Sequence, residues 1–110
     1  MNFDGNLDFS VLSSDVTVYD DTTPEQLLER IEGADIIVTK EMPVNGDLIR
    51  KFPASVKRIC EAGTGYNNLD LDAAREMGIT VCNIPAYSSE RVAHTAIMMI
   101  LNLSSTMQVQ

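Results

Sequence analysis

The stretch Val56–Tyr87, VKRICEAGTGYNNLDLDAAREMGITVCNIPAY, decides the fold of this chain. It opens with an apolar run typical of a buried strand, turns at Gly63 and Gly65, continues through a short helix ending at Gly78, and closes with a second strand before Pro85. This succession predicts a βαβ unit. Because open parallel sheets bind ligands beyond the carboxyl ends of their strands, the turn after the first strand is also the candidate binding site.

Length and charge limit what the chain can be. A length of 110 residues suits one domain over residues 1–110, and 16 acidic against 8 basic residues give a net charge of -8. Such a surface disfavours nucleic acid and anionic lipid as partners. The longest apolar stretch, Ala96–Leu101, is too short to cross a bilayer, and the first ten residues do not resemble a secretion signal. We therefore expect a cytoplasmic protein without a membrane or nucleic-acid partner.

Strand and helix patterns alternate along the whole chain. Thr23 with Gln26 predicts a capping box, and Asn45 and Asp70 are good caps for later helices. The nearly continuous apolar run 34–39 is typical of a strand covered by helices on both faces. The expected strands are 16–19, 34–39, 56–61 and 79–84, and the expected helices are 24–33, 46–52, 71–77 and 88–107.

The last predicted helix carries more apolar residues than one buried face requires. Its apolar positions from Val92 to Met107 occupy more than one side of a helix. A small sheet offers too little surface to bury them all. We therefore expect this helix to contact another chain, and we predict a homo-oligomer through Val92–Met107.

The Gly63-Thr64-Gly65 loop is the candidate anion site. Glycine allows backbone amides to approach a carboxylate or phosphate closely. A tight strand-to-helix turn is the alternative, and on spacing alone it is the more common one. The loop is not a dinucleotide fingerprint, since no third glycine follows and Tyr66-Asn67-Asn68 does not open a helix.

Tyr87 follows the last predicted strand on the same edge of the sheet. Two adjacent strands ending together would place its hydroxyl near the amides of Thr64 and Gly65, where it would donate to a substrate oxygen. The equally weighted alternative is a half-buried aromatic side chain that closes the loop.

Other titratable residues have simpler explanations. His94 is four residues after Glu90, which favours a surface pair over a catalytic base. Glu61 lies in a strand that should be buried, so its carboxylate needs a partner such as Lys40 or a helix amide, and we expect it to be strained or to line the cleft.

The two cysteines, Cys60 and Cys82, have no metal-ligand spacing, which predicts buried free thiols and no structural metal.

Two long segments resemble the D-isomer-specific 2-hydroxyacid dehydrogenases. They are TVYDDTTPEQLLERIEGADIIVTKEMPV (17–44) and AGTGYNNLDLDAAREMGITVCNIPAYSSERVAHT (62–95). The resemblance implies a flavodoxin-like, three-layer α/β/α substrate-binding domain with a mainly parallel sheet. It also implies reduction of 2-keto acids with NAD or NADP, with the amides of Thr64 and Gly65 on the substrate carboxylate and Tyr87 near the substrate.

The same resemblance implies that the chain holds part of an enzyme. Family members carry their nucleotide fingerprint and their catalytic Arg, Glu and His in a Rossmann domain downstream, and His94 does not correspond to that histidine. We therefore expect no catalytic residue here, truncation at both ends with a first strand lost, no cofactor binding by this chain alone, and no turnover.

Two other functions stay open. One is a signalling or binding module that uses Asp20, Asp21 and Lys40, although solvated turn acids are the simpler explanation of the aspartates. The other is a remnant whose only role is to bind a partner.

Overall fold

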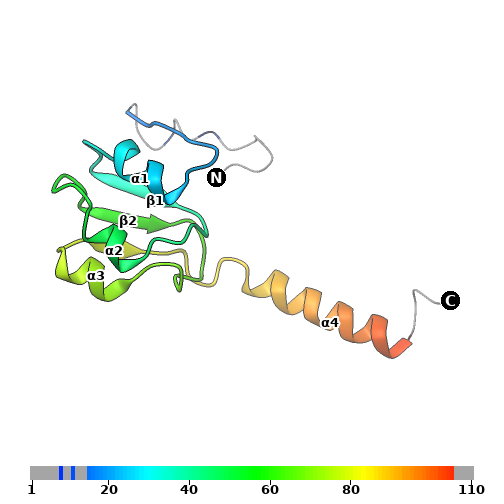
Figure 1. The fold of residues 1–110 in the computed structure, drawn as a ribbon. Coiled ribbons are helices and arrows are strands. Elements are labelled where there is room, and N and C mark those ends of the chain that lie inside the picture. The colour runs from blue at the N-terminus through cyan, green and yellow to red at the C-terminus, as the bar shows by residue number, and fades with distance from the viewer. Residues whose placement is uncertain (1–7, 9–10, 12–14, 106–110) are drawn as a thin grey trace.

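A computed structural model of the chain describes residues 8, 11 and 15–105, which form one parallel sheet and four helices (Figure 1). The strands are hydrogen-bonded in the order β1-β2-β3, and both pairs are parallel. The predicted α/β class with a parallel sheet is confirmed and is consistent with a flavodoxin-like domain. The elements are α1 (Pro24–Arg30), β1 (Ile36–Thr39), α2 (Gly46–Ile49), β2 (Arg58–Glu61), α3 (Leu71–Glu76), β3 (Thr80–Cys82) and α4 (Ser89–Ser105).

The predicted caps begin the three short helices. The Thr23 hydroxyl accepts the Gln26 amide while the Gln26 side chain accepts the Thr23 amide, so the capping box at α1 is confirmed. Asn45 accepts the Leu48 amide at 2.9 Å, and Asp70 accepts the Ala73 amide at 3.0 Å. Local side-chain chemistry therefore fixes where α1, α2 and α3 start.

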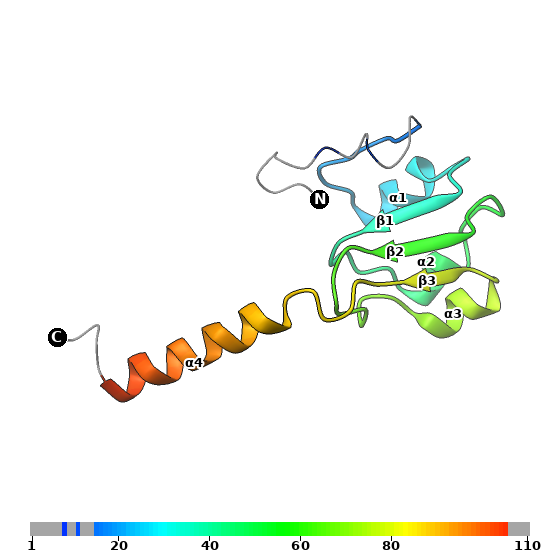
Figure 2. The same cartoon turned by 180° about the vertical axis from the view of Figure 1, so that it is seen from behind.

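One hydrophobic core packs the three short helices against one face of the sheet. Side chains alternate along the strands, so Ile37 and Ile59 enter the core while Ile36 and Val38 leave the other face, with exposed fractions of 56% and 51%. In Figure 2 the strands lie in front of α2. Among the described residues the prediction that helices cover both faces of the strand at 34–39 is wrong. The core residues are Leu27, Ile31, Ile37, Val44, Ile49, Phe52, Val56, Ile59, Leu69, Ala73, Ala74 and Ile79.

The predicted strand at Val16–Tyr19 does not form. These residues are exposed and pair with no strand in the described part of the chain. Arg30 instead holds this segment, stacking over the Tyr19 ring at 4.4 Å and donating to the Thr22 hydroxyl at 2.7 Å. A β-branched sequence without a neighbouring strand cannot complete a hydrogen-bonded ladder, so it stays unpaired.

Helix α4 projects away from the sheet (Figure 1). None of its residues is buried, and the molecule measures 59 × 31 × 24 Å. The radius of gyration is 18.1 Å, whereas a compact chain of this length would have about 13 Å.

The predicted end of this helix at Met107 and the predicted loss of a first strand near the N-terminus fall outside the described residues. No helix in the described part of the chain is long and apolar enough to span a membrane.

Candidate functional site

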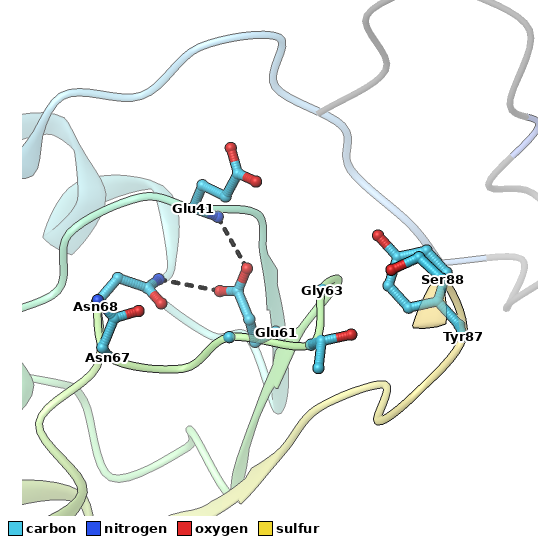
Figure 3. Close-up of a pocket in the computed structure, with 9 residues that line it drawn as sticks. Glu41, Glu61, Gly63, Asn67, Asn68, Tyr87 and Ser88 are labelled. Carbon is cyan, nitrogen blue, oxygen red and sulfur yellow. Dashed lines mark hydrogen bonds between the residues drawn. The ribbon is translucent and has the colours of Figure 1, made fainter. Parts of the chain in front are cut away.

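An open cleft lies at the carboxyl ends of the three strands, where the βαβ pattern predicted a binding site. It encloses about 360 Å³, which is within the usual range for small-molecule sites. Segments that follow β1, β2 and β3 each contribute to its wall. The lining residues are Glu41, Glu61, Gly63, Thr64, Gly65, Asn67, Asn68, Tyr87 and Ser88 (Figure 3).

The Gly63–Gly65 loop is fixed by hydrogen bonds to the segment after β3. The Gly63 carbonyl accepts the Ile84 amide at 2.9 Å, and the Thr64 hydroxyl donates to the Ile84 carbonyl at 2.9 Å. Asn83 donates its side-chain amide to the Thr64 carbonyl at 2.7 Å. The carbonyl oxygens of Gly63 and Thr64 therefore both accept hydrogen bonds from the segment that follows β3.

The backbone amides of the same loop have no hydrogen-bond acceptor in the part of the chain that the structure describes. The N–H groups of Gly63, Thr64 and Gly65 donate no hydrogen bond to any residue that the structure describes. Gly63 is partly buried, while Thr64 and Gly65 are more accessible. Amides that are neither paired nor fully buried seek an external acceptor, and consecutive ones suit an anion. The free amides are compatible with the predicted anion site, which stays a prediction.

Glu61 forms the floor of the cleft and is 1% exposed. Its carboxylate accepts three hydrogen bonds, from the Thr39 hydroxyl at 2.8 Å, the Glu41 amide at 2.8 Å and the Asn68 side chain at 3.0 Å. The prediction that Glu61 lines the cleft is confirmed. The suggested partners, Lys40 or a helix amide, are wrong, because a loop amide and two neutral side chains satisfy this carboxylate.

Two strained backbone positions flank the cleft. Glu41 and Ala86 have φ angles of 56° and 59°, and they are the non-glycine residues with positive φ in the described part of the chain. Such conformations cost roughly 1–3 kcal/mol each and gather at functional sites. Glu41 uses its conformation to aim its amide at Glu61, while Ala86 turns the chain into Tyr87.

Tyr87 lies across the loop from Glu61 in Figure 3 and lines the same cleft. The residue is 61% exposed, so the alternative interpretation, a half-buried aromatic side chain that closes the loop, is wrong. The structure brings Tyr87, Gly63, Thr64 and Gly65 together as predicted, and contact between Tyr87 and a substrate stays a prediction.

Several predicted candidates lie away from the cleft or differ in burial. His94 is exposed on α4, and among the described residues it forms no ion pair with Glu90. Asp20 and Asp21 are exposed and are not cleft residues, and the described residues hold no group of three His, Cys, Asp or Glu able to bind a metal.

The two cysteines are free, but the prediction that they are buried is wrong. Cys60 is half-buried and Cys82 is exposed, because both lie on the uncovered face of the sheet.

Sequence reasoning missed four cleft residues: Glu41, Asn67, Asn68 and Ser88. Asn68 joins two walls by donating to the Met42 carbonyl at 2.8 Å as well as to Glu61. The Asn67-Asn68 pair, one residue after the glycine loop, is a usable signal in the sequence. Glu41 has a positive φ. A positive φ is usually expected only at glycine or asparagine, so the sequence did not predict this conformation at position 41.

The chain is similar in sequence to proteins of one family. The family model described as "D-isomer specific 2-hydroxyacid dehydrogenase, catalytic domain" matches residues 6–110. A hydroxypyruvate reductase of Blautia hydrogenotrophica is 35% identical over 104 residues, which covers 90% of this chain and 32% of that protein. A D-3-phosphoglycerate dehydrogenase of Methanocaldococcus jannaschii is 40% identical over 88 residues, which covers 79% of this chain and 17% of that protein.

The fold is also similar to solved structures. A crystal structure of a glyoxylate reductase from Paecilomyes thermophila superposes with a TM-score of 0.72 at 31% identity, covering 86% of this chain and 33% of that one. The chain spans at most about a third of the length of each of these three relatives.

Proposed function

Because this chain belongs to the D-isomer specific 2-hydroxyacid dehydrogenase family, we propose that it is the substrate-binding part of an NAD(P)-dependent oxidoreductase that interconverts 2-keto acids and D-2-hydroxy acids. Residues 1–110 would form one substrate-binding domain of a cytoplasmic enzyme. Relatives named hydroxypyruvate reductase and glyoxylate reductase support this substrate class.

One observation carries the proposal: Gly63, Thr64 and Gly65 line a cleft of small-molecule size, and their three consecutive backbone amides have no acceptor among the described residues. They would donate to the substrate carboxylate and so fix which way the carbonyl carbon points. Orientation of this kind can supply much of the rate of a two-substrate reaction. Tyr87, on the opposite wall, would donate its hydroxyl to a substrate oxygen.

The charged side chains that line the cleft indicate which charge another part of the enzyme would have to supply. Glu41 and Glu61 both line it, and no lysine or arginine of the described residues does. Within this chain, amide dipoles alone would hold an anion beside two carboxylates, so binding of the anion by this chain would be weak. We therefore propose that a cation outside this chain completes the site, in agreement with the family resemblance, which places the catalytic arginine in another domain.

The described residues do not fit a dinucleotide. A pyrophosphate is normally held where a glycine turn runs directly into a helix N-terminus. Here α3 starts only at Leu71, and its N-terminus is capped by the Asp70 carboxylate, which would repel phosphate. The proposal assigns NAD or NADP, the hydride donor, to another part of the complete enzyme, and this chain alone is expected to be inactive.

Removing one loop amide tests the carboxylate site. Gly65→Pro deletes an N–H, whereas Gly65→Ala keeps it and places a methyl group 3.6 Å from Asn67 Oδ1, an ordinary contact. Loss of one charge-assisted hydrogen bond, about 1.5–3 kcal/mol, should weaken pyruvate binding roughly ten- to hundred-fold. The measurement is an NMR titration of backbone amides with pyruvate and, as a control, methyl pyruvate.

We expect shifts at residues 63–65 with pyruvate only, and parent-like binding by the alanine variant. Unchanged affinity of a proline variant whose remaining amide spectrum is native would refute the carboxylate site.

We further propose that the chain forms a homo-oligomer through α4. Val92 and Leu103 are 63% and 78% exposed, and residues 95–105 carry no charge. An uncharged apolar helix surface fits a second copy of itself, since it carries neither charges that repel nor charges that require an opposite partner. Light scattering should give a dimer or larger species, and Met99→Glu with Leu103→Glu should give a monomer. A monomeric parent would refute this.

A further inference from the structure

Cys60 and Cys82 are direct neighbours on the uncovered face of the sheet. They are register partners in the parallel β2–β3 ladder. The residues on either side of Cys60, Ile59 and Glu61, are buried in the covered face, and Val81 packs against the core. Alternation along a strand therefore sends both cysteine side chains out of the same opposite face.

The two thiols differ in access. Cys82 is exposed and Cys60 is half-buried, and neither is in a disulfide. Burial raises the pKa of the Cys60 thiol, with a further increase from Cys82, while the Arg58 cation two residues earlier lowers it. The exposed thiol is thus suited to react first with a reagent in solution, and the shielded one is placed to react second.

We infer that Cys60 and Cys82 form a reversible dithiol–disulfide pair. Low-molecular-weight disulfides such as oxidised glutathione would oxidise the two thiols to the disulfide. The Cys82 thiolate attacks one glutathione sulfur, which forms a mixed disulfide and releases one glutathione thiolate. The Cys60 thiolate then attacks the Cys82 sulfur and releases the second glutathione. Two electrons pass from the cysteines to oxidised glutathione, and the two thiol protons end on the released glutathione thiols.

Sheet geometry permits this bond and makes it easy to reduce. Neighbouring strands lie about 4.8 Å apart, within the Cα separations of about 4.4–6.8 Å that disulfides span. Side chains that leave the same face run side by side, so their Cβ atoms keep a similar spacing, which is wider than the usual value of about 3.8 Å. A disulfide closed across that spacing is strained, and strained exposed disulfides are the ones that small dithiols reduce readily.

The experiment is intact-mass spectrometry of the full chain after incubation with oxidised glutathione and acid quenching. We expect the parent to lose two hydrogens and retain no glutathione, and dithiothreitol to reverse this change. Cys60→Ser, which removes the second thiol, should retain one glutathione on Cys82. Cys82→Ser should add glutathione at Cys60 more slowly than Cys60→Ser adds it at Cys82.

Because the parent has only these two cysteines, each outcome is unambiguous. A parent that keeps one or two glutathione adducts, stays unmodified, or forms disulfide-linked dimers on a non-reducing gel would overturn the inference. Native amide spectra of both serine variants would show that their behaviour does not come from unfolding.

Discussion

The two faces of the sheet are made from alternate residues of the same strands, yet they have opposite environments. On the covered face, Ile59 and Glu61 are each 1% exposed. On the other face, Ile36 and Val38 are more than half exposed, and both cysteines lie there. An apolar strand sequence thus indicates which faces of a sheet can be buried, whereas the available helices decide which face is buried.

The largest expected effect comes from the covered face. Ile59→Ala should destabilise the protein by roughly 2–5 kcal/mol, because it deletes buried methyl groups and leaves a cavity. Val38→Ala, on the open face of the neighbouring strand, should change stability by no more than about 0.5 kcal/mol. Urea unfolding of both variants measures the difference.

If the alanine variant is too unstable to study, Ile59→Val should still lower the free energy of unfolding by about 0.5–1.5 kcal/mol. Equal losses of stability in the Ile59 and Val38 variants would mean that the open face is covered in solution, which would contradict the difference between the two faces.

A smaller effect is expected at the cleft end of the covered face. Glu61→Gln leaves one acceptor oxygen where the carboxylate has two, so at least one of the donors from Thr39, Glu41 and Asn68 loses its partner. An unsatisfied buried donor costs about 1–3 kcal/mol. Chemical denaturation measures this cost, with Glu29→Gln on the exposed side of α1 as the matched control. A loss no larger than that of the control would argue that the three hydrogen bonds contribute little.

The smallest effect concerns the exposed start of α1, one of the helices that cover the closed face. Its own backbone amide first, and then the Thr23 hydroxyl, hold the pKa of Glu25 below its ordinary value of 4.5. The ionised form is therefore favoured in the folded state. Its contribution is present above the unfolded-state pKa and is lost as the pH falls through the lower folded-state value.

Glu25→Gln should thus lower the urea midpoint slightly near neutral pH and leave it unchanged in strong acid. A difference between variant and parent that persists at low pH would point to a lost packing contact instead.

Features encoded by near neighbours could be predicted from the sequence. Thr23 and Gln26 are three residues apart, so their capping box needs no knowledge of the rest of the fold. The βαβ unit of 56–87 likewise follows from one continuous pattern, and its strand ends located the cleft.

Features that depend on distant partners could not be predicted. Residues 16–19 have strand-forming side chains, but a strand needs a neighbour that the described residues do not provide. Glu61 is satisfied by groups 7 to 22 residues away, and one of them depends on the positive φ of Glu41. Only the folded chain brings those donors together.

The point where α4 leaves the body has a consequence for partner binding. The helix starts at Ser89, directly after the cleft residues Tyr87 and Ser88, and the turn before them bends at Ala86. The first turn of α4 therefore lies next to the cleft along the chain, so a partner that binds the start of α4 would sit within a few residues of Tyr87 and Ser88.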